Sequence, residues 1–454
     1  MHRRFAIFAL LPLCLASILT AQDTRKVVEP VLPRPCAVLD AQLQTAGRSL
    51  APGDETRLDT GRIQKAIDTC AKGRGVLLQP HGSANAFLSG PLQLRPGVTL
   101  IVAAGATLYA SRNPELYATT SGSCGVVADS DDGCKALINV LHAPNAAVMG
   151  NGTIDGRGGE TMLGTSVPWW QLALQARNGL HQQVPRIIYA NHSSNFTLYR
   201  ITLKNSPFFH VVYEHGDGFT VWGIRIDTPK DEAHNADGID PGQGTRNITI
   251  TRSFVRTGDD HVALKAGHGG VTNMTVSHNH FYWGHGMSIG SETYGGASSI
   301  RVFDLSLDGP DDGIRIKSNS SRGGLVHNVV YDDVCIRNSP HPIILDEHYV
   351  NAGTQDKHLY PSTSDITFHN VRISGGGKFT FSGYSSDYRV SAILDGVQIT
   401  DSATYTYALS HADIRLGPSP TNLELPVGED STQQGTASKG AAASCSEKFI
   451  PFPL

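Results

Sequence analysis

The chain has 454 residues, of which 40% are hydrophobic and 17% are charged, so it carries enough apolar material for a large folded core. These proportions exclude disorder as the main state. The formal net charge of -4 gives no general attraction for polyanions. We therefore expect no nucleic-acid partner, and an anionic ligand would have to be held by a local cluster of bases.

Residues 1–21 have the features of a secretory signal. The basic start MHRR is followed by an apolar run from Phe5 to Leu19. We therefore expect the chain to be secreted, to the periplasm or outside the cell, and to have no membrane contact after signal removal. No later stretch is apolar for long enough to span a bilayer.

Six cysteines remain after the signal, and in an exported protein they favour disulfides over metal ligands. Their spacing is unlike that of a zinc site. Six cysteines allow about 15 pairings. The pairings we expect are Cys124 with Cys134, which would close a loop rich in Gly and Asp, Cys36 with Cys70, and, as the remainder, Cys335 with Cys445.

A short amphipathic helix is predicted near the start of the mature chain. Residues Thr60 to Lys72 place Ile63, Ala66, Ile67 and Cys70 on one helical face. An uncovered sheet edge invites aggregation, so we expect this helix to cap the open end of the structure that follows.

A repeat of short strands dominates the rest of the sequence. Its copies begin at similar intervals, at Asn195, Gly218, Asn247, Asn273, Ser299, Asn328, Asp365 and Ser391. Strands that recur in this way with no helix between them predict an all-β, single-domain parallel β-helix of about ten coils, with the recurring Asn residues stacked in a turn. We expect the domain to span residues 22–423, and residues 424–454 to form a low-complexity tail that Cys445 ties down.

Four polar segments interrupt the apolar pattern of the repeat. They are NADG (235–238), GDDH (258–261), GHG (284–286) and RIK (315–317). Asp259 and His285 occupy the same position in their two copies, counted from Asn247 and Asn273, so they are expected to stack in one groove. A later position, again shared between copies, forms a second polar line that could bind an anionic sugar chain, made of Lys265, Ser291, Lys317 and Asp346.

The three aspartates in these segments suit glycoside hydrolysis. That reaction needs one carboxylic acid to protonate the leaving oxygen and one carboxylate to activate water or to attack. Asp237, Asp259 and Asp260 supply three candidates, and both adjacent aspartates can face the groove only if Gly258 bends the chain. An Asp-Asp pair alone is more often a calcium loop or solvated surface, so the evidence lies in all four segments together.

Together the four segments resemble the signature of the polygalacturonases, glycoside hydrolase family twenty-eight, and are nearest to the bacterial members. The resemblance extends from about Cys36 to Ile399. It implies a right-handed parallel β-helix, hydrolysis of pectin or polygalacturonate with inversion, and no cofactor or metal ion. Two positions depart from the family pattern: Ala236 stands in place of Thr, and His261 in place of Cys or Asn.

The resemblance also implies roles for individual residues. Asp259 would be the general acid, with His285 tuning its proton, while Asp237 and Asp260 would hold and activate the water. The residues expected to bind the substrate are Asn235, Arg315, Lys317 and Tyr349, with Lys265 added from the polar line.

Several alternatives stay open at this stage. An exo-acting enzyme releasing mono- or digalacturonate would differ only in the loops at one end of the groove, and we favour endo action because the loop insertions are moderate. A calcium-dependent pectate lyase could use Asp259 and Asp260 as ligands. A β-helix that binds polysaccharide without catalysis is a third possibility. We expect a monomer.

Overall fold

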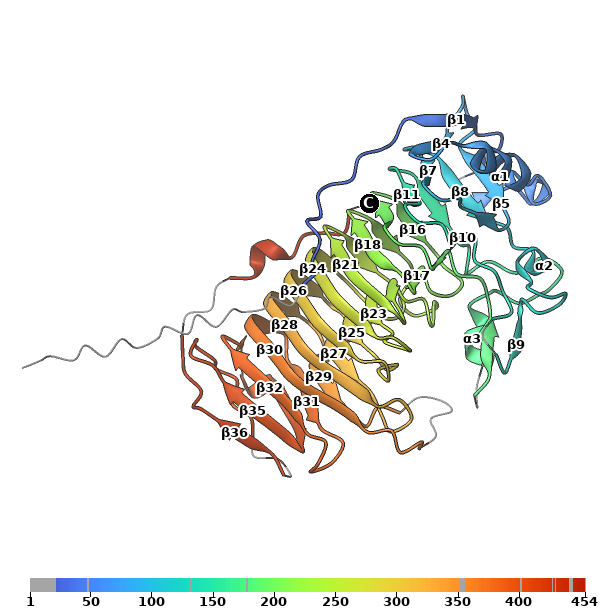
Figure 1. Ribbon diagram of the computed structural model, residues 1–454. Helices are drawn as coiled ribbons and strands as arrows, with labels where there is room; N and C mark the ends of the chain where they lie inside the picture. Colours follow the sequence, from blue (N-terminus) through green and yellow to red (C-terminus); the bar gives the residue numbers. More distant parts are fainter. Residues whose placement is uncertain are drawn as a thin grey trace, which may run out of the picture.

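The computed structural model describes residues 22–46, 49–130, 132–176, 179–350, 356–400, 402–426, 428, 430–440 and 444–453. The signal expected at residues 1–21 lies outside this range. Figure 1 shows a long stack of coils in which strands far apart in the sequence lie side by side. None of the described helices is long and apolar enough to cross a membrane.

Two sheets of parallel strands build the stack, which is a right-handed parallel β-helix as expected. The smaller sheet has 11 strands among the described residues. In chain order they are β6 (Leu92–Gln93), β10 (Ile138–Leu141), β14 (Ile188–Asn191), β17 (Val211–Glu214), β20 (Ile239–Pro241), β23 (Val262–Leu264), β25 (Met287–Ile289), β27 (Asp312–Lys317), β29 (His341–Asp346), β31 (Gly377–Ser382) and β34 (Tyr405–Ser410).

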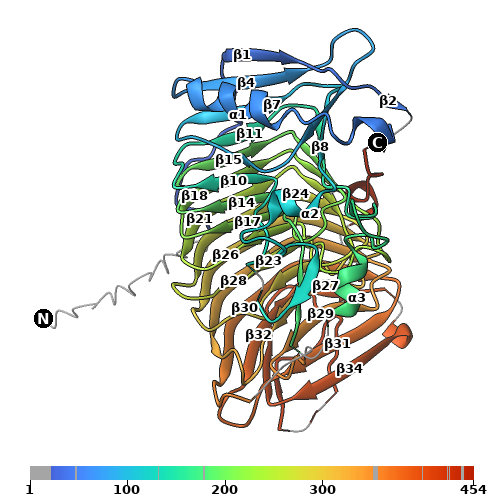
Figure 2. The same ribbon diagram turned by 90° about the vertical axis from the view of Figure 1, so that its right-hand side faces the viewer.

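The larger sheet wraps around the other sides of the stack (Figure 2). Its strands are β1 (Pro35–Asp40), β4 (Arg74–Gln79), β5 (Ala86–Ser89), β7 (Val98–Val102), β8 (Thr107–Ala110), β11 (Ala147–Met149), β12 (Thr153–Asp155), β15 (Phe196–Tyr199), β16 (Thr202–Lys204), β18 (Asp217–Trp222), β19 (Arg225–Asp227), β21 (Thr245–Thr251), β22 (Phe254–Arg256), β24 (Val271–Phe281), β26 (Ala297–Asp308), β28 (Gly324–Arg337), β30 (Pro361–Ser374), β32 (Val390–Asp395), β33 (Gln398–Ile399), β35 (Ala412–Leu416) and β36 (Thr432–Gln434). β36 lies beyond residue 423 and pairs in parallel with β35.

The short elements lie outside these two sheets. Two antiparallel pairs are formed by β2 (Thr45–Ala46) with β3 (Ser49–Leu50) and by β9 (Val126–Ala128) with β13 (His181–Gln183). Helices α2 (Pro114–Tyr117) and α3 (Gln171–Gln175) are single turns in the loops. The 3₁₀ turns cover Pro52–Asp54, Ser402–Thr404 and Ser446–Lys448.

Helix α1 (Thr60–Thr69) confirms the predicted helix, although it is shorter than expected. Its buried residues Ile63 and Ile67 belong to the same core as the coils, and it lies at one end of the stack in Figure 2. The helix stops because Cys70 has extended backbone angles and forms a disulfide with Cys36. The other two predicted disulfides, Cys124–Cys134 and Cys335–Cys445, are also present.

The repeat begins where the backbone turns. Asn195, Asn247, Asn273 and Asn328 all have φ between 53° and 59°, the left-handed region that Asn enters more easily than most residues. The expected Asn ladder is only partly formed. The Nδ2 group of Asn195 donates to the side chain of Asn145 at 3.2 Å, but that of Asn247 donates to an aspartate, Asp217, at 2.7 Å.

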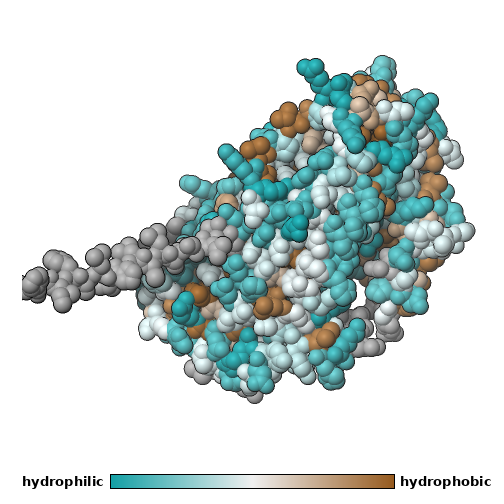
Figure 3. All heavy atoms as spheres, viewed as in Figure 1, coloured by the Kyte–Doolittle hydropathy of each residue, from teal (hydrophilic) through white to brown (hydrophobic). Residues whose placement is uncertain are grey.

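Both ends of the described chain are fastened across the outside of the coils. The Asp23 carboxylate accepts a hydrogen bond from Thr249 at 2.7 Å, and the Asp23 amide donates to Thr275 at 3.0 Å. In the tail, Lys448 forms ion pairs with Asp304 and Asp333. The face seen in Figure 3 is mostly polar, with apolar side chains in small separate groups.

Candidate active site

The register of the small sheet brings the four polar segments together. The parallel pairing aligns Ile239 of β20 with Val262, Met287 and Ile314 of the next three strands. Asp237, Asp260 and His285 each lie two residues before these aligned positions and are therefore in neighbouring coils. Arg315 and Lys317 extend from β27 in the next coil. The register thus brings the four segments together in neighbouring coils.

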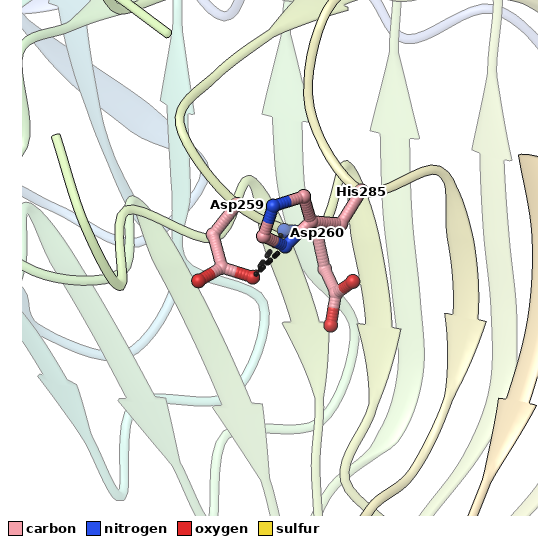
Figure 4. A group of neighbouring side chains, drawn as sticks. All are labelled: Asp259, Asp260 and His285. Atoms are coloured by element: carbon pink, nitrogen blue, oxygen red, sulfur yellow. Dashed lines mark hydrogen bonds and ion pairs between the residues drawn. The ribbon is translucent and has the colours of Figure 1, made fainter. Parts of the chain in front are cut away.

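Asp259 and Asp260 lie between β22 and β23, outside the regular strands. The backbone runs too close here for a side chain at Gly258, since a Cβ atom would lie 2.2 Å from the carbonyl oxygen of Ala233. Because the two adjacent aspartates are not in a regular strand, their side chains do not have to point to opposite faces, and both reach the same groove. One carboxylate oxygen of Asp259, one of Asp260 and one ring nitrogen of His285 all lie within 4.8 Å of one another (Figure 4).

Asp259 and His285 form a hydrogen-bonded pair. The distance between Nδ1 of His285 and Oδ1 of Asp259 is 2.9 Å, and the amide of Asp260 donates to the same oxygen at 2.8 Å. Burial favours the neutral form of each group, but their mutual interaction outweighs it: the pKa of Asp259 is lowered and the pKa of His285 is raised. The interaction therefore favours a carboxylate on Asp259 beside a protonated imidazole on His285, a pair that holds one proton.

Asp260 is held as an anion. It is buried, and its carboxylate accepts from Arg315 at 2.5 Å, from Lys317 at 3.1 Å and from the hydroxyl of Ser288 at 2.6 Å. Burial alone would raise the pKa of Asp260, but Arg315 and Lys317 lower it strongly. This carboxylate cannot act as a proton donor near neutral pH.

The carboxylate of Asp237 is compensated by fewer positive charges than that of Asp260. Asp237 is only 3% exposed, and its one ion pair among the described residues is with Lys265, whose Nζ lies 2.9 Å from Oδ2. Burial raises the pKa of Asp237 to about 7, although Lys265 acts in the opposite direction. Among the three aspartates, Asp237 is thus the one whose charge changes near neutral pH.

Three further predicted residues surround this cluster. The Nζ atom of Lys317 lies 5.1 Å from the centre of the Tyr349 ring. The amide group of Asn235 donates to Gln182 of β13 at 3.2 Å. Asn235 and Lys265 line a cleft of about 450 Å³ beside Asp237, together with Phe209, Glu292 and Arg322.

The predicted second polar line is correct except at one position. Lys317 pairs with Asp346, and extending the pairing of Leu264 with Ile289 by one residue places Lys265 in the same line. The expectation for Ser291 was wrong, because this register puts Gly290 opposite Lys317 instead. Thr245 pairs with Val271 in the large sheet, but Val262 pairs with Met287 in the small one, so the connection from β24 into β25 is one residue shorter than those of the neighbouring coils.

Sequence reasoning missed two residues that hold Asp260 in place. Ser288 is opposite Arg315 in the register and accepts a hydrogen bond from it at 3.2 Å. Asp312 forms an ion pair with the same guanidinium. Ser288 could have been found from the strand register, because it lies in β25, one coil beyond Asp260 and just after His285.

His261 was singled out only as a departure from the family pattern, but it supports the loop that carries His285. The buried ring accepts a hydrogen bond from the amide of Gly286 and lies 2.9 Å from the carbonyl oxygen of Trp283. Burial lowers the pKa of His261 to about 4, so the ring is neutral and its Nε2–H donates to Trp283. A side chain at Gly284 would lie 2.9 Å from this ring, which explains the glycine.

The carboxylates fit a calcium ion poorly. Calcium needs six to eight oxygen ligands. Among the described residues the one group with metal-ligand spacing is Asp259, Asp260 and His285, and the Asp260 oxygens are already occupied by two cations and a hydroxyl. A calcium-dependent lyase at this position is therefore disfavoured.

Comparison with known proteins identifies the family. The profile described as glycosyl hydrolases family 28 matches residues 96–410. The chain belongs to this family. The matched range includes every predicted site residue, from Asn235 to Tyr349.

Bacterial family 28 proteins are similar over most of their length. An endo-polygalacturonase of Pectobacterium carotovorum subsp. carotovorum is 41% identical over 388 residues, which cover 85% of this chain and 92% of that protein. A polygalacturonase of Ralstonia nicotianae is 37% identical, with coverage of 94% and 92%. The solved polygalacturonase from Erwinia carotovora ssp. carotovora superposes with a TM-score of 0.78 at 40% identity, covering 87% of this chain and all of that one.

Proposed function

We propose that this family 28 hydrolase is a secreted, monomeric polygalacturonase that cleaves the galacturonic acid backbone of pectin from within the chain. The observation that carries the proposal is that two neighbouring carboxyl groups differ in their access to a proton. Asp259 shares a proton with His285, while Asp260, the next residue, is fixed as an anion by Arg315 and Lys317. Glycoside hydrolysis needs one proton donor and one carboxylate.

The reaction begins when the proton shared by the pair passes from His285 through Asp259, the general acid, to the glycosidic oxygen. The bond between that oxygen and the anomeric carbon breaks as a water molecule attacks the carbon. Asp260 orients the water, and Asp237 takes its proton when ionised. Each cycle consumes one water, and loss of a proton from Asp237 to solvent with uptake of one by His285 restores the starting protonation states.

The stereochemical outcome is proposed to be inversion. Inverting enzymes usually separate the two carboxyl groups by roughly 6.5–9.5 Å to leave room for water. Asp259 and Asp260 have oxygens within 4.8 Å, which is closer than this range. The water must therefore be activated from the side of Asp237. Proton NMR of the first product formed gives the anomer, and a product that keeps the configuration of the substrate would contradict inversion.

Lys317 is the better of the two cations for binding a substrate carboxylate. Arg315 uses three of its five N–H groups on Asp260, Asp312 and Ser288, so its main role is to hold Asp260. Lys317 has three donors and, among the described residues, a hydrogen bond only to Asp260. Tyr349 beside it can pack on a sugar ring, and Asn235 and Lys265 line the cleft on the other side of the cluster.

The decisive experiment is a time course of products from polygalacturonate. Endo action gives a ladder of oligomers early in the reaction, whereas monomer or dimer alone from the start would exclude it. Products that absorb ultraviolet light and disappear with a chelator would indicate a lyase. N-terminal sequencing and gel filtration of the exported protein test signal removal and the monomeric state.

A further inference from the structure

Lys265 is shared between two buried carboxyl groups. Its Nζ atom lies 2.9 Å from Oδ2 of Asp237 and 3.8 Å from Oδ2 of Asp240, a residue of β20. Asp240 is completely buried, whereas 26% of the Lys265 side chain is exposed. One positive charge thus faces two carboxyl groups, and it can compensate only one of them fully as an anion.

The two carboxyl groups are not equivalent. Asp237 is within hydrogen-bonding distance of Lys265, but neither oxygen of Asp240 has a hydrogen-bond partner among the described residues. Burying a carboxyl group that is neutral and unpartnered is less unfavourable than burying one whose charge is not compensated. The geometry therefore favours a proton on Asp240.

The charges around Asp240 act in the same direction. Burial raises its pKa well above the ordinary value, and the neighbouring Asp237, Asp259 and Asp260 add to this effect, with Lys265 alone opposing it. Glu292 from the far side of the cleft acts on Lys265 but is itself paired with Arg322 at 3.0 Å. No second cation is therefore directed at Asp240 among the described residues.

We propose that Asp240 is a positioning residue that remains protonated during turnover, which leaves the charge of Lys265 to the carboxylate of Asp237. This assignment rests on the proposed function for its catalytic meaning, because Asp237 must be ionised to accept a proton from water. If Asp240 were also ionised, it would compete for Lys265 and keep Asp237 protonated to higher pH.

Infrared spectroscopy of the full-length secreted protein tests the protonation state without any assay of activity. We expect the carbonyl band of protonated carboxylic acids in the wild type at neutral pH, and a weaker band in Asp240→Asn, with the intensity of one acid lost in the difference spectrum. Glu292→Gln is the matched control, since it removes an ionised carboxyl group beside the same lysine, and it should keep the band. Identical spectra for the wild type and Asp240→Asn would overturn the proposal.

The pH dependence of kcat/KM on polygalacturonate tests the consequence for Asp237. Lys265→Met should move the acidic limb upward by a unit or more, because Asp237 loses its cation. Asp240→Asn should leave the midpoint of that limb within about 0.3 units, because asparagine resembles the neutral acid. A downward shift of one unit or more in Asp240→Asn would show that Asp240 is normally ionised. Inactivity of the wild type on polygalacturonate would instead refute the proposed function and leave the infrared result standing.

Discussion

Replacing Asp259 by asparagine separates its chemical role from its structural role. The amide oxygen of asparagine can still accept from the Asp260 amide and from His285, the two bonds made at 2.8 and 2.9 Å. In both hydrogen bonds the acceptor is then a neutral amide oxygen in place of a carboxylate, which makes each bond weaker by about 1 kcal/mol. The unfolding free energy is thus expected to fall by at most about 2 kcal/mol. The amide cannot donate a proton to the leaving oxygen, so kcat should fall by about 10²–10⁴-fold, equivalent to about 3–5 kcal/mol in the barrier.

The assay is the release of reducing ends from polygalacturonate, with urea unfolding measured in parallel. Asp308→Asn is the matched control, because Asp308 forms two hydrogen bonds with Arg337 on the larger sheet, away from the groove. The control should lose stability but keep kcat. A kcat of Asp259→Asn within threefold of the wild type would refute Asp259 as the general acid.

Four further results are expected. Lys317→Met should raise KM for polygalacturonate by at least tenfold, and an unchanged KM would remove Lys317 from substrate binding. The raised pKa of His285 keeps the shared proton in place to higher pH, so the basic limb of the kcat/KM profile should have its midpoint above about 6.5; a basic midpoint below 5 would contradict the shared proton. His261→Phe keeps the ring but removes both loop hydrogen bonds, and should lower kcat and the melting temperature with little change in KM. Replacing Cys335 and Cys445 by serine opens a loop of 110 residues and should cost roughly 4–5 kcal/mol in urea unfolding without changing kcat at about 25 °C.

The sequence was sufficient to predict the β-helix because the turn at the start of each copy requires a residue that can adopt a positive φ. The left-handed φ at Asn195, Asn247 and Asn273 favours Asn, Asp or Gly, and the same preference returns in the following copies of the repeat. The apolar positions that follow are then fixed by strand alternation. Both signals are local and repeat many times, so a single sequence shows them clearly.

The contacts within the site could be predicted less completely. A partner in the next coil lies one whole repeat away along the chain, and the length of that repeat depends on each connection. One residue fewer between β24 and β25 than in the neighbouring coils was enough to misplace Ser291. Asp240 and Ser288 look like ordinary strand residues in the sequence, and only the register shows that they lie beside Lys265 and Asp260.

The fastening of Asp23 has a consequence for the order of folding. Its partners Thr249 and Thr275 lie 226 and 252 residues further along the chain. During synthesis or export from the first residue onward, the segment around Asp23 cannot form these hydrogen bonds until the coils containing β21 and β24 have formed. Assembly of the central coils therefore precedes attachment of the leading segment, and a bulky group fused next to Asp23 would interfere with this late step.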